Sequence, residues 1–224
     1  MPRVVEVSRA RAGGPLKLAL PRGALWEETL DALDRIGVDT SKLRSDSRSL
    51  VFESGGLSLV TMRPSDVPTY VEAGAADLGI TGKDVLLEQP DRIVYEVLDL
   101  RYGACRMVLA GRVGDTALDE DERRLGGMRI ATKYPRVAER HFEETGHRAE
   151  VIEVRGSVEL APLVGLADGI VDLVATGRTL HENGLEIRKE IATSTARLVA
   201  NRVSHKLRAA EVDDLVERLR PETS

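Results

Sequence analysis

The sequence predicts an α/β fold, because short apolar runs alternate with amphipathic, helix-like stretches along most of the chain. Apolar residues fill consecutive positions of these runs, which is typical of buried and largely parallel strands. The length of 224 residues and the hydrophobic content of 42% suffice for one large core or two modest ones. The expected strands cover residues 16–20, 76–80, 93–98, 107–110, 129–132, 151–154, 170–174 and 198–201.

The first expected helix covers residues 25–36 and follows the first strand directly. Trp26, Leu30 and Leu33 recur at spacings of three or four, which places them on one face of a helix. Gly37 follows as a C-cap, since glycine adopts the left-handed conformation in which many helices end.

Later segments predict further helices. One opens at Ser65, tolerates Pro68 in its first turn because that turn leaves the N–H unused, and closes at Gly74. A third helical unit runs over residues 157–166 before the strand at 170–174. The C-terminal segment 207–219 carries apolar residues at near-helical spacing and can pad the core or meet a partner.

Composition excludes several classes of function. The net charge of −5 and an aromatic content of 3% argue against a nucleic-acid binder, because such proteins use surplus basic residues and aromatic stacking. Cys105 is the single cysteine, so neither an intrachain disulfide nor a cysteine-based zinc site can form. No signal-peptide or membrane-spanning run is present, which predicts a cytoplasmic protein without a membrane partner. Residues 1–15 are expected to be a loose extension, and the charged stretch 111–127 an exposed helix or loop near a domain junction.

The most informative segment is IVDLVATGRTL, residues 170–180. A buried strand delivers Asp172 and then a Thr-Gly-Arg-Thr turn. Backbone N–H groups, the hydroxyls of Thr176 and Thr179 and the guanidinium of Arg178 can bind a monophosphate, and Gly177 lets the backbone approach the anion closely. Asp172 can accept hydrogen bonds from ribose hydroxyls. The alternative is a strand-ending turn without a ligand.

This segment resembles the ribose-phosphate loop of type I phosphoribosyltransferases, in which acidic residues precede a Thr-Gly-x-Thr turn; here only Asp172 is acidic. The whole chain, however, resembles the ATP phosphoribosyltransferase family in several separate places. The matching segments are LALPRG at 18–23, RPSDVPTYVEAGAADLGITGKD at 63–84, RIATKYP at 129–135, GSVELAP at 156–162, the loop itself and STARLVAN at 194–201.

The resemblance implies two α/β domains hinged around a cleft, as in type II periplasmic binding proteins. Domain I is expected to comprise residues 1–108 plus 193–224, and domain II residues 109–192. The implied reaction is the first step of histidine biosynthesis: N1 of the ATP adenine displaces diphosphate from phosphoribosyl diphosphate, giving phosphoribosyl-ATP. The alternative is a non-catalytic two-domain ligand-binding protein or regulatory subunit.

The resemblance also assigns the loop residues to the substrate. The phosphoribosyl-binding loop falls on Asp172, Leu173, Val174, Ala175, Thr176, Gly177, Arg178, Thr179 and Leu180. Glu159 is a candidate for hydrogen bonding to the nucleotide, although capping of a helix N-terminus would explain it equally well. Lys133 and Tyr134 lie just past a strand end, where α/β proteins bind ligands.

Basic residues of the first domain are expected to meet polyphosphate and to stabilise the departing diphosphate. Arg22 stands where the family usually has lysine, and Ala24 replaces the arginine that usually follows the glycine. Arg63 is assigned to the diphosphate or triphosphate, against the alternative of a surface ion pair with Asp66. Arg22 and Arg63 are therefore the predicted catalytic residues.

Gly82 and Lys83 follow a strand and can place the ammonium near phosphate at a helix start, although Lys83 can equally be solvated. The four histidines lack metal-ligand spacing and predict no metal site in the protein. Mg²⁺ is still expected, held mainly by substrate phosphates and waters.

The remaining expectations concern partners. The chain ends soon after STARLVAN, which predicts the short form of the family, without the histidine-sensing C-terminal domain. The short form works with a separate regulatory subunit resembling histidyl-tRNA synthetase. A homodimer and a larger hetero-oligomer with that subunit are therefore expected.

Overall fold

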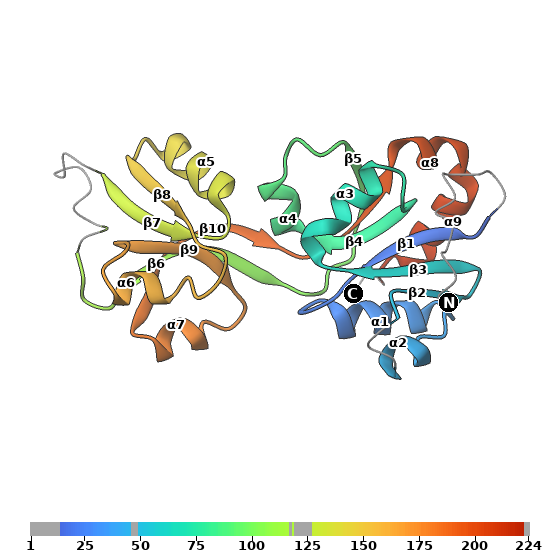
Figure 1. The fold of residues 1–224 in the computed structure, drawn as a ribbon, viewed down its shortest axis with the longest axis horizontal. Coiled ribbons are helices and arrows are strands. Elements are labelled where there is room, and N and C mark those ends of the chain that lie inside the picture. Colours follow the sequence, from blue (N-terminus) through green and yellow to red (C-terminus); the bar gives the residue numbers. More distant parts are fainter. Residues whose placement is uncertain (1–13, 46–48, 117, 119–126, 222–224) are drawn as a thin grey trace, which may run out of the picture. The chain divides into compact units, whose positions relative to one another are not determined.

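The computed structural model describes residues 14–45, 49–116, 118 and 127–221. It divides into two compact units, each with its own mixed sheet (Figure 1). The first unit comprises Met1–Leu86, Pro90–Gly103 and Thr195–Ser224, and the second comprises Leu87–Gln89 and Ala104–Ser194. The sequence predicted that the chain passes between the two domains after residues 108 and 192; in the structure it does so after Gly103 and Ser194. Most of the expected N-terminal extension and of the charged stretch 111–127 lies outside the described residues.

The first unit is built on a six-stranded sheet in the order β2-β3-β1-β4-β11-β5. Helices and one 3₁₀ turn connect and cover these strands. The strands are β1 (Leu16–Pro21), β2 (Val51–Ser54), β3 (Leu57–Met62), β4 (Leu78–Gly82), β5 (Val94–Asp99) and β11 (Ala196–Asn201). The helices are α1 (Trp26–Arg35), α2 (Ser41–Ser45), η1 (Pro64–Asp66), α3 (Val67–Glu72), α4 (Lys83–Glu88), α8 (Arg202–Leu207) and α9 (Ala209–Leu219).

Three neighbouring strands of this sheet, β3, β1 and β4, run parallel. Their register pairs Pro21 with Met62 and Ala19 with Gly79, so the three strands end at one edge of the sheet. In contrast, β2, β11 and β5 join by antiparallel pairing. The prediction of largely parallel strands is therefore wrong. The error arises because a strand that is buried on both faces is apolar whatever its direction.

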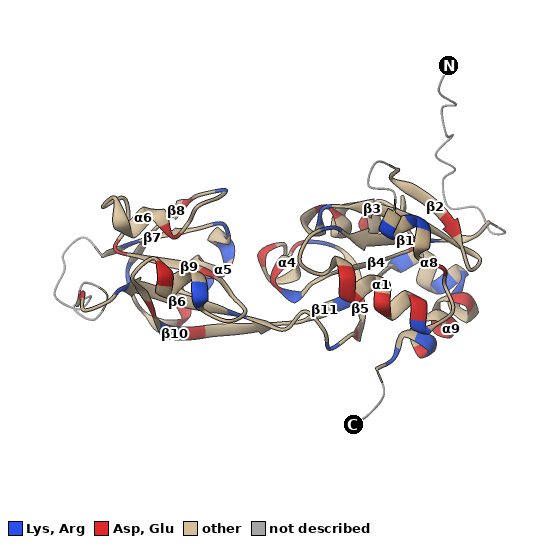
Figure 2. Ribbon diagram, turned by 90° about the horizontal axis from the view of Figure 1, so that it is seen from below, with Lys and Arg blue, Asp and Glu red and all other residues tan. Residues whose placement is uncertain are grey.

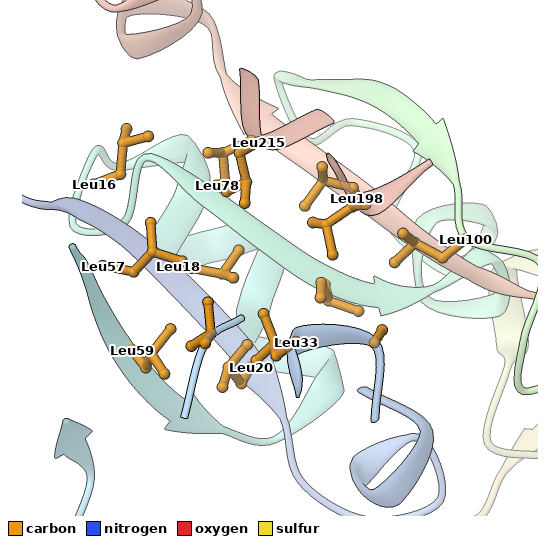
Figure 3. Packing of buried hydrophobic residues seen from close by; sticks show 14 of the residues in the cluster. Leu16, Leu18, Leu20, Leu33, Leu57, Leu59, Leu78, Leu100, Leu198 and Leu215 are labelled. Carbon is orange, nitrogen blue, oxygen red and sulfur yellow. The ribbon is translucent and has the colours of Figure 1, made fainter. Parts of the chain in front are cut away.

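The core of the first unit is a cluster of leucines from the sheet and from helices packed on it. Figure 3 shows Leu18, Leu20 and Leu59 gathered with Leu33 of α1. Residues Val212, Leu215 and Leu219 of α9 are buried in the same cluster, so the C-terminal helix pads the core. Burial of this kind contributes about 25 cal/mol per Å² of apolar surface and is the main stabilising term.

The helix boundaries of the first unit follow local signals. Gly37 has φ +80° and donates its N–H to the carbonyl of Asp34, as predicted for a C-cap of α1. The second predicted helix is a 3₁₀ turn, η1, that continues as α3, with Pro68 in the first turn. Gly74 (φ +71°) follows that helix, as predicted.

A buried carboxylate fastens the C-terminal helices to the sheet. Asp77 is 6% exposed and accepts hydrogen bonds from the Lys17 N–H (2.9 Å), the Ser204 hydroxyl (2.6 Å) and Arg208 (3.4 Å). The side chain of Asn201 caps α8 by accepting from the N–H groups of Val203 and Ser204. These bonds satisfy polar groups that would otherwise be costly to bury.

The second unit holds a five-stranded sheet in the order β10-β6-β9-β7-β8. Only β7 pairs in parallel with β8 and β9; the other pairs are antiparallel. The strands are β6 (Cys105–Arg112), β7 (Met128–Thr132), β8 (Ala149–Glu153), β9 (Gly169–Val174) and β10 (Leu185–Ser194), and the helices are α5 (Pro135–Thr145), α6 (Leu160–Leu163) and α7 (Arg178–Glu182).

The N-terminus of α5 is capped by Glu88, the last residue of α4, which belongs with Leu87 and Gln89 to the second unit. Glu88 accepts hydrogen bonds from the N–H groups of Arg136 and Val137, both at 3.1 Å. Burial raises the pKa of Glu88 above its ordinary value, and the two N–H donors and the charge of Arg136 only partly oppose this shift.

Several elements differ from the sequence predictions. Strands β2, β3 and β10 were not predicted, and the third helical unit, expected over 157–166, contains only the short helix α6. Lys and Arg are interspersed with Asp and Glu along both units, as Figure 2 shows. No helix in the described part of the chain is long and apolar enough to cross a membrane.

Candidate functional site

In the second unit, the loop between β9 and α7 forms a tight turn around Gly177. This residue has φ +79°, a left-handed conformation that favours glycine. The N–H of Arg178 faces the hydroxyl oxygen of Thr176 at 3.4 Å, and the N–H of His181 bonds to the carbonyl of Gly177 at 3.1 Å. The strand therefore passes directly into a short helix, with hydroxyls on either side of the glycine.

This loop lines a hollow of about 260 Å³. Its walls are Glu159 and every residue from 172 to 180, all within the second unit. The structure thus brings into one hollow the predicted residues Glu159, Asp172, Leu173, Val174, Ala175, Thr176, Gly177, Arg178, Thr179 and Leu180.

The single carboxylate of the loop is held in place by its surroundings. Asp172 accepts a hydrogen bond from the N–H of Leu173 at 2.8 Å and lies 3.2 Å from the ammonium of Lys133. The pair follows from the sheet, because Thr132 of β7 is in register with Val171 of β9. Lys133 also lies 5.3 Å from the ring centroid of Tyr134.

Glu159 and Arg178 remain available to a ligand. Glu159 stands at the N-cap of α6, but its side chain makes no capping hydrogen bond, so the capping alternative is wrong. The guanidinium of Arg178 is exposed, and no described residue accepts a hydrogen bond from it. The free guanidinium and the hydroxyls around Gly177 can bind a phosphate without first breaking other contacts.

In the first unit, two arginines stand side by side at the edge where the parallel strands end. Arg22 follows β1 and Arg63 follows β3, and the register of Pro21 with Met62 makes them neighbours. The N–H of Arg22 bonds to the carbonyl of Met62 at 2.8 Å, which continues the ladder past the strands. Ligands of α/β proteins bind at this carboxyl edge.

The two arginines differ in how they are held. Arg63 is exposed, and the structure shows no ion pair with Asp66, which instead lies 3.5 Å from the hydroxyl of Ser65. The alternative of a surface pair is therefore wrong. Arg22, in contrast, contacts Thr61 and lies over the ring of Trp26.

The predicted Gly82 and Lys83 lie at the end of the third parallel strand. The ammonium of Lys83 is 2.6 Å from Glu96, so it is neither free for phosphate nor simply solvated. Glu96 also pairs with Arg197 at 3.3 Å. A Cβ at Gly82 would lie 2.1 Å from the carboxylate of Asp84, so this glycine makes room for a neighbouring side chain of its own chain.

Sequence reasoning missed the residues that surround Arg22. Thr61 belongs to β3, a strand that was not predicted, and its contact with Arg22 depends on long-range pairing. Trp26 was predicted only as a helix-face residue, although it lies four positions after Arg22, within reach of a long side chain. No group of three or more His, Cys, Asp or Glu side chains suited to a metal ion occurs among the residues that the structure describes.

Comparison with known proteins settles the family. A family model described as HisG: ATP phosphoribosyltransferase matches residues 63–221. The chain belongs to the ATP phosphoribosyltransferase family. The ATP phosphoribosyltransferase of Rubrobacter xylanophilus is 52% identical over 202 residues, which cover 90% of this chain and 93% of that protein. The ATP phosphoribosyltransferase of Caldanaerobacter subterraneus is 46% identical over 209 residues, 92% of this chain and 96% of that protein.

Solved structures agree with this family. The ATP phosphoribosyl transferase (HisG:HisZ) complex from Thermotoga maritima is 40% identical, covers 91% of this chain and 96% of that chain, and has a TM-score of 0.77. The predicted family and the predicted enzyme class, a pentosyltransferase, are thereby confirmed.

More distant structures show the fold alone. The periplasmic aliphatic sulphonate binding protein SsuA of Escherichia coli has a TM-score of 0.59 at 12% identity, covering 93% of this chain and 72% of that chain. The periplasmic VFT2 domain of Bordetella pertussis BvgS has a TM-score of 0.54 at 13% identity, covering 91% and 89%. The predicted likeness of this ATP phosphoribosyltransferase family member to periplasmic binding proteins is confirmed.

Proposed function

We propose that the chain catalyses the reaction for which its relatives are named, with the loop of the second unit as the phosphoribosyl site. The 1-diphosphate of phosphoribosyl diphosphate leaves as N1 of the ATP adenine bonds to the anomeric carbon, giving phosphoribosyl-ATP. This is the first step of histidine biosynthesis. The observation that carries the proposal is the hollow lined by residues 172–180 in a chain of this family.

In this proposal the loop binds the 5-phosphate of the donor. The hydroxyls of Thr176 and Thr179, the N–H groups around Gly177 and the guanidinium of Arg178 surround the anion. Asp172 then accepts hydrogen bonds from the ribose hydroxyls, and its contact with Lys133 (3.2 Å) keeps the carboxylate oriented. Glu159, which lines the same hollow, accepts from a second ribose or nucleotide hydroxyl.

The parallel-strand edge of the first unit supplies the cations for polyphosphate. Arg22 and Arg63 stabilise the negative charge that develops on the departing diphosphate or hold the ATP triphosphate. Adenine N1 already carries a lone pair, so the reaction requires alignment and charge stabilisation rather than an activated side-chain nucleophile. Lys83 can bind polyphosphate only if the phosphate displaces Glu96 from its ammonium. Gly82 is the last residue of β4 and places Lys83 at the end of that strand.

The proposal includes Mg²⁺ bound mainly through substrate phosphates. We expect phosphate and water oxygens to fill most of the coordination sphere of the ion. When bound, the ion would neutralise part of the diphosphate charge. Of the loop residues 172–180, Asp172 alone carries a carboxylate that could supply a ligand to the ion.

The likeness to the HisG:HisZ complex supports a partner of the same kind for this chain. We propose that it works in the cytoplasm as the short form, as a homodimer in a hetero-oligomer with a regulatory subunit resembling histidyl-tRNA synthetase. Inhibition by histidine would then require that subunit.

The proposal is tested by following phosphoribosyl-ATP formation by absorbance, with ATP, phosphoribosyl diphosphate, Mg²⁺ and pyrophosphatase. We expect Arg178→Ala to lower kcat/KM about 100-fold, because a charge-assisted phosphate contact is lost. Arg148→Ala removes another exposed arginine of the same unit that does not line the hollow, and should leave activity unchanged.

Two results would contradict parts of this proposal. Full activity of Arg178→Ala would contradict the assignment of the loop as the phosphate site, although the chain would still be a transferase. No product from folded wild-type chain, with and without the regulatory subunit, would favour the alternative of a non-catalytic binding protein or regulatory subunit.

A further inference from the structure

The guanidinium of Arg22 is held from three directions within the first unit. Its Nε–H donates to the hydroxyl oxygen of Thr61 at 3.2 Å, and Nη2 lies 3.4 Å from the carbonyl oxygen of Ser49. Its Cζ lies 4.8 Å from the centroid of the Trp26 ring. An arginine side chain has several rotatable bonds, so three simultaneous contacts restrict it far more than a surface arginine is restricted.

These contacts leave one edge of the guanidinium unused. Two of the five N–H groups of an arginine are directed at Thr61 and Ser49, and no residue in the described parts of the chain accepts from the others. The unused groups include both N–H bonds of Nη1 and one of Nη2. This pair of nitrogens is the fork that binds two oxygens of one phosphate.

The residues that hold Arg22 are themselves fixed. Thr61 is 3% exposed and lies in β3, the strand paired in register with β1. Trp26 begins α1 and packs against the leucine cluster of the first unit. An aromatic face attracts a cation through its quadrupole, and the flat guanidinium can also stack on it, which a lysine ammonium cannot do.

From this geometry we infer that Trp26 and Thr61 are positioning residues, which orient Arg22 so that its free fork binds a diphosphate or triphosphate group. The inference rests on the proposed role of Arg22 and assigns Trp26 and Thr61 to the polyphosphate site. Neither residue touches the reacting atoms. Both reduce the conformational entropy that the Arg22 side chain loses when phosphate binds, because they already hold it in the binding orientation.

A purely structural role for Trp26 is the competing explanation, since the ring is half-buried against the core. The two explanations differ in what Arg22 contributes. If Trp26 positions Arg22, replacing Trp26 has no effect on phosphate binding once Arg22 is removed. If Trp26 only packs in the core, the effect of replacing it persists without Arg22. A double-mutant cycle between Trp26 and Arg22 therefore separates them.

The test measures tripolyphosphate binding to the full chain by calorimetry, together with steady-state kinetics. Trp26→Leu keeps an apolar group in the core but removes the ring, and we expect the Kd for tripolyphosphate to rise about 3- to 30-fold. Trp26→Phe should restore most of the affinity, because a ring remains beneath the guanidinium. Thr61→Val, nearly the same shape, should raise Kd about 3-fold through loss of the acceptor.

The cycle and a matched control complete the design. In an Arg22→Gln background, Trp26→Leu should cause no further loss of binding or of kcat/KM. Tyr95→Leu removes another ring that lies under an arginine of the same unit, with the Arg202 Cζ 5.3 Å from its centroid, and should leave Kd unchanged. Thermal melting of each variant checks that it is folded.

Three outcomes would overturn the inference: unchanged binding in Trp26→Leu, equal losses in Trp26→Leu and Trp26→Phe, or a Trp26→Leu loss of the same size in the Arg22→Gln background. The binding experiment needs no turnover. If the variants bind tripolyphosphate as expected but wild type forms no product, the proposed function fails and the positioning role stands.

Discussion

Replacing Gly177 by alanine separates the two interpretations of the loop at residues 172–180. At this position a Cβ would meet only Val174 Cγ1, at 3.8 Å, so alanine fits the described structure without a clash. The φ of +79° remains unfavourable for alanine by about 1–2 kcal/mol. The stiffer unfolded chain offsets about 0.4–1 kcal/mol of this cost. We expect the free energy of unfolding to fall by about 1 kcal/mol.

The expected effect on activity is much larger if phosphate lies against the backbone. The added methyl group would push the anion away from the N–H groups of the turn, each of which contributes about 1.5–3 kcal/mol to a charged acceptor. Loss of about two such bonds lowers kcat/KM by a factor on the order of 10²–10⁴. The assay is steady-state kinetics with varied phosphoribosyl diphosphate, alongside urea denaturation.

Gly146→Ala is the matched control. Gly146 has φ +75°, ends α5 in the same unit and has no heavy atom within 4 Å of its Cβ position. It should therefore show the same small loss of stability and full activity. If Gly177→Ala also keeps full activity, the backbone does not contact the phosphate and the turn serves the fold alone.

Two further predictions concern the first unit. Asp77→Ala should lower the free energy of unfolding by about 1–3 kcal/mol in urea denaturation, because it removes the acceptor of the buried Ser204 hydroxyl, whereas Arg208 keeps its pair with Glu211. Glu217→Ala, which breaks an exposed pair, should cost less than about 1 kcal/mol; equal losses would contradict the argument. Burial raises the pKa of Tyr102 to about 12, so its contribution to stability is present below pH 10 and is lost as pH rises through 12. Tyr102→Phe should abolish about 3 kcal/mol of stability loss between pH 10 and 12, and an unchanged dependence of stability on pH would refute this argument.

Local sequence patterns predicted much of the fold. The helix α1 and its C-cap were predictable because apolar spacing and glycine act within a few residues of each other. The loop after β9 was predictable for the same reason, since a buried strand, a glycine with positive φ and two hydroxyls are consecutive in the sequence.

The missed strands show where local patterns fail. Strands β2 and β3 flank Gly55 and Gly56 and pair as an antiparallel hairpin. The sequence does contain a signal for it, because two adjacent glycines separate segments in which apolar and polar residues alternate. Strand β10 lies at a sheet edge and alternates charged with apolar residues, so no continuous apolar run marks it. The neighbouring positions of Arg22 and Arg63 depend on β3, and therefore on pairing between distant segments.

The contrast between Arg44 and the proposed anion-binding arginines shows what distinguishes a binding site from a charged surface. Arg44 lies within 3.0 Å of carboxylates of Glu27, Asp31 and Asp34, so an incoming phosphate would have to displace them. The guanidiniums of Arg63 and Arg178 face no carboxylate among the described residues. In a protein of net charge −5, a phosphate can bind only where positive charge has been left unneutralised. Arg63 and Arg178 meet this condition. Two lysines that also follow strands do not, because Lys83 is paired with Glu96 and Lys133 with Asp172.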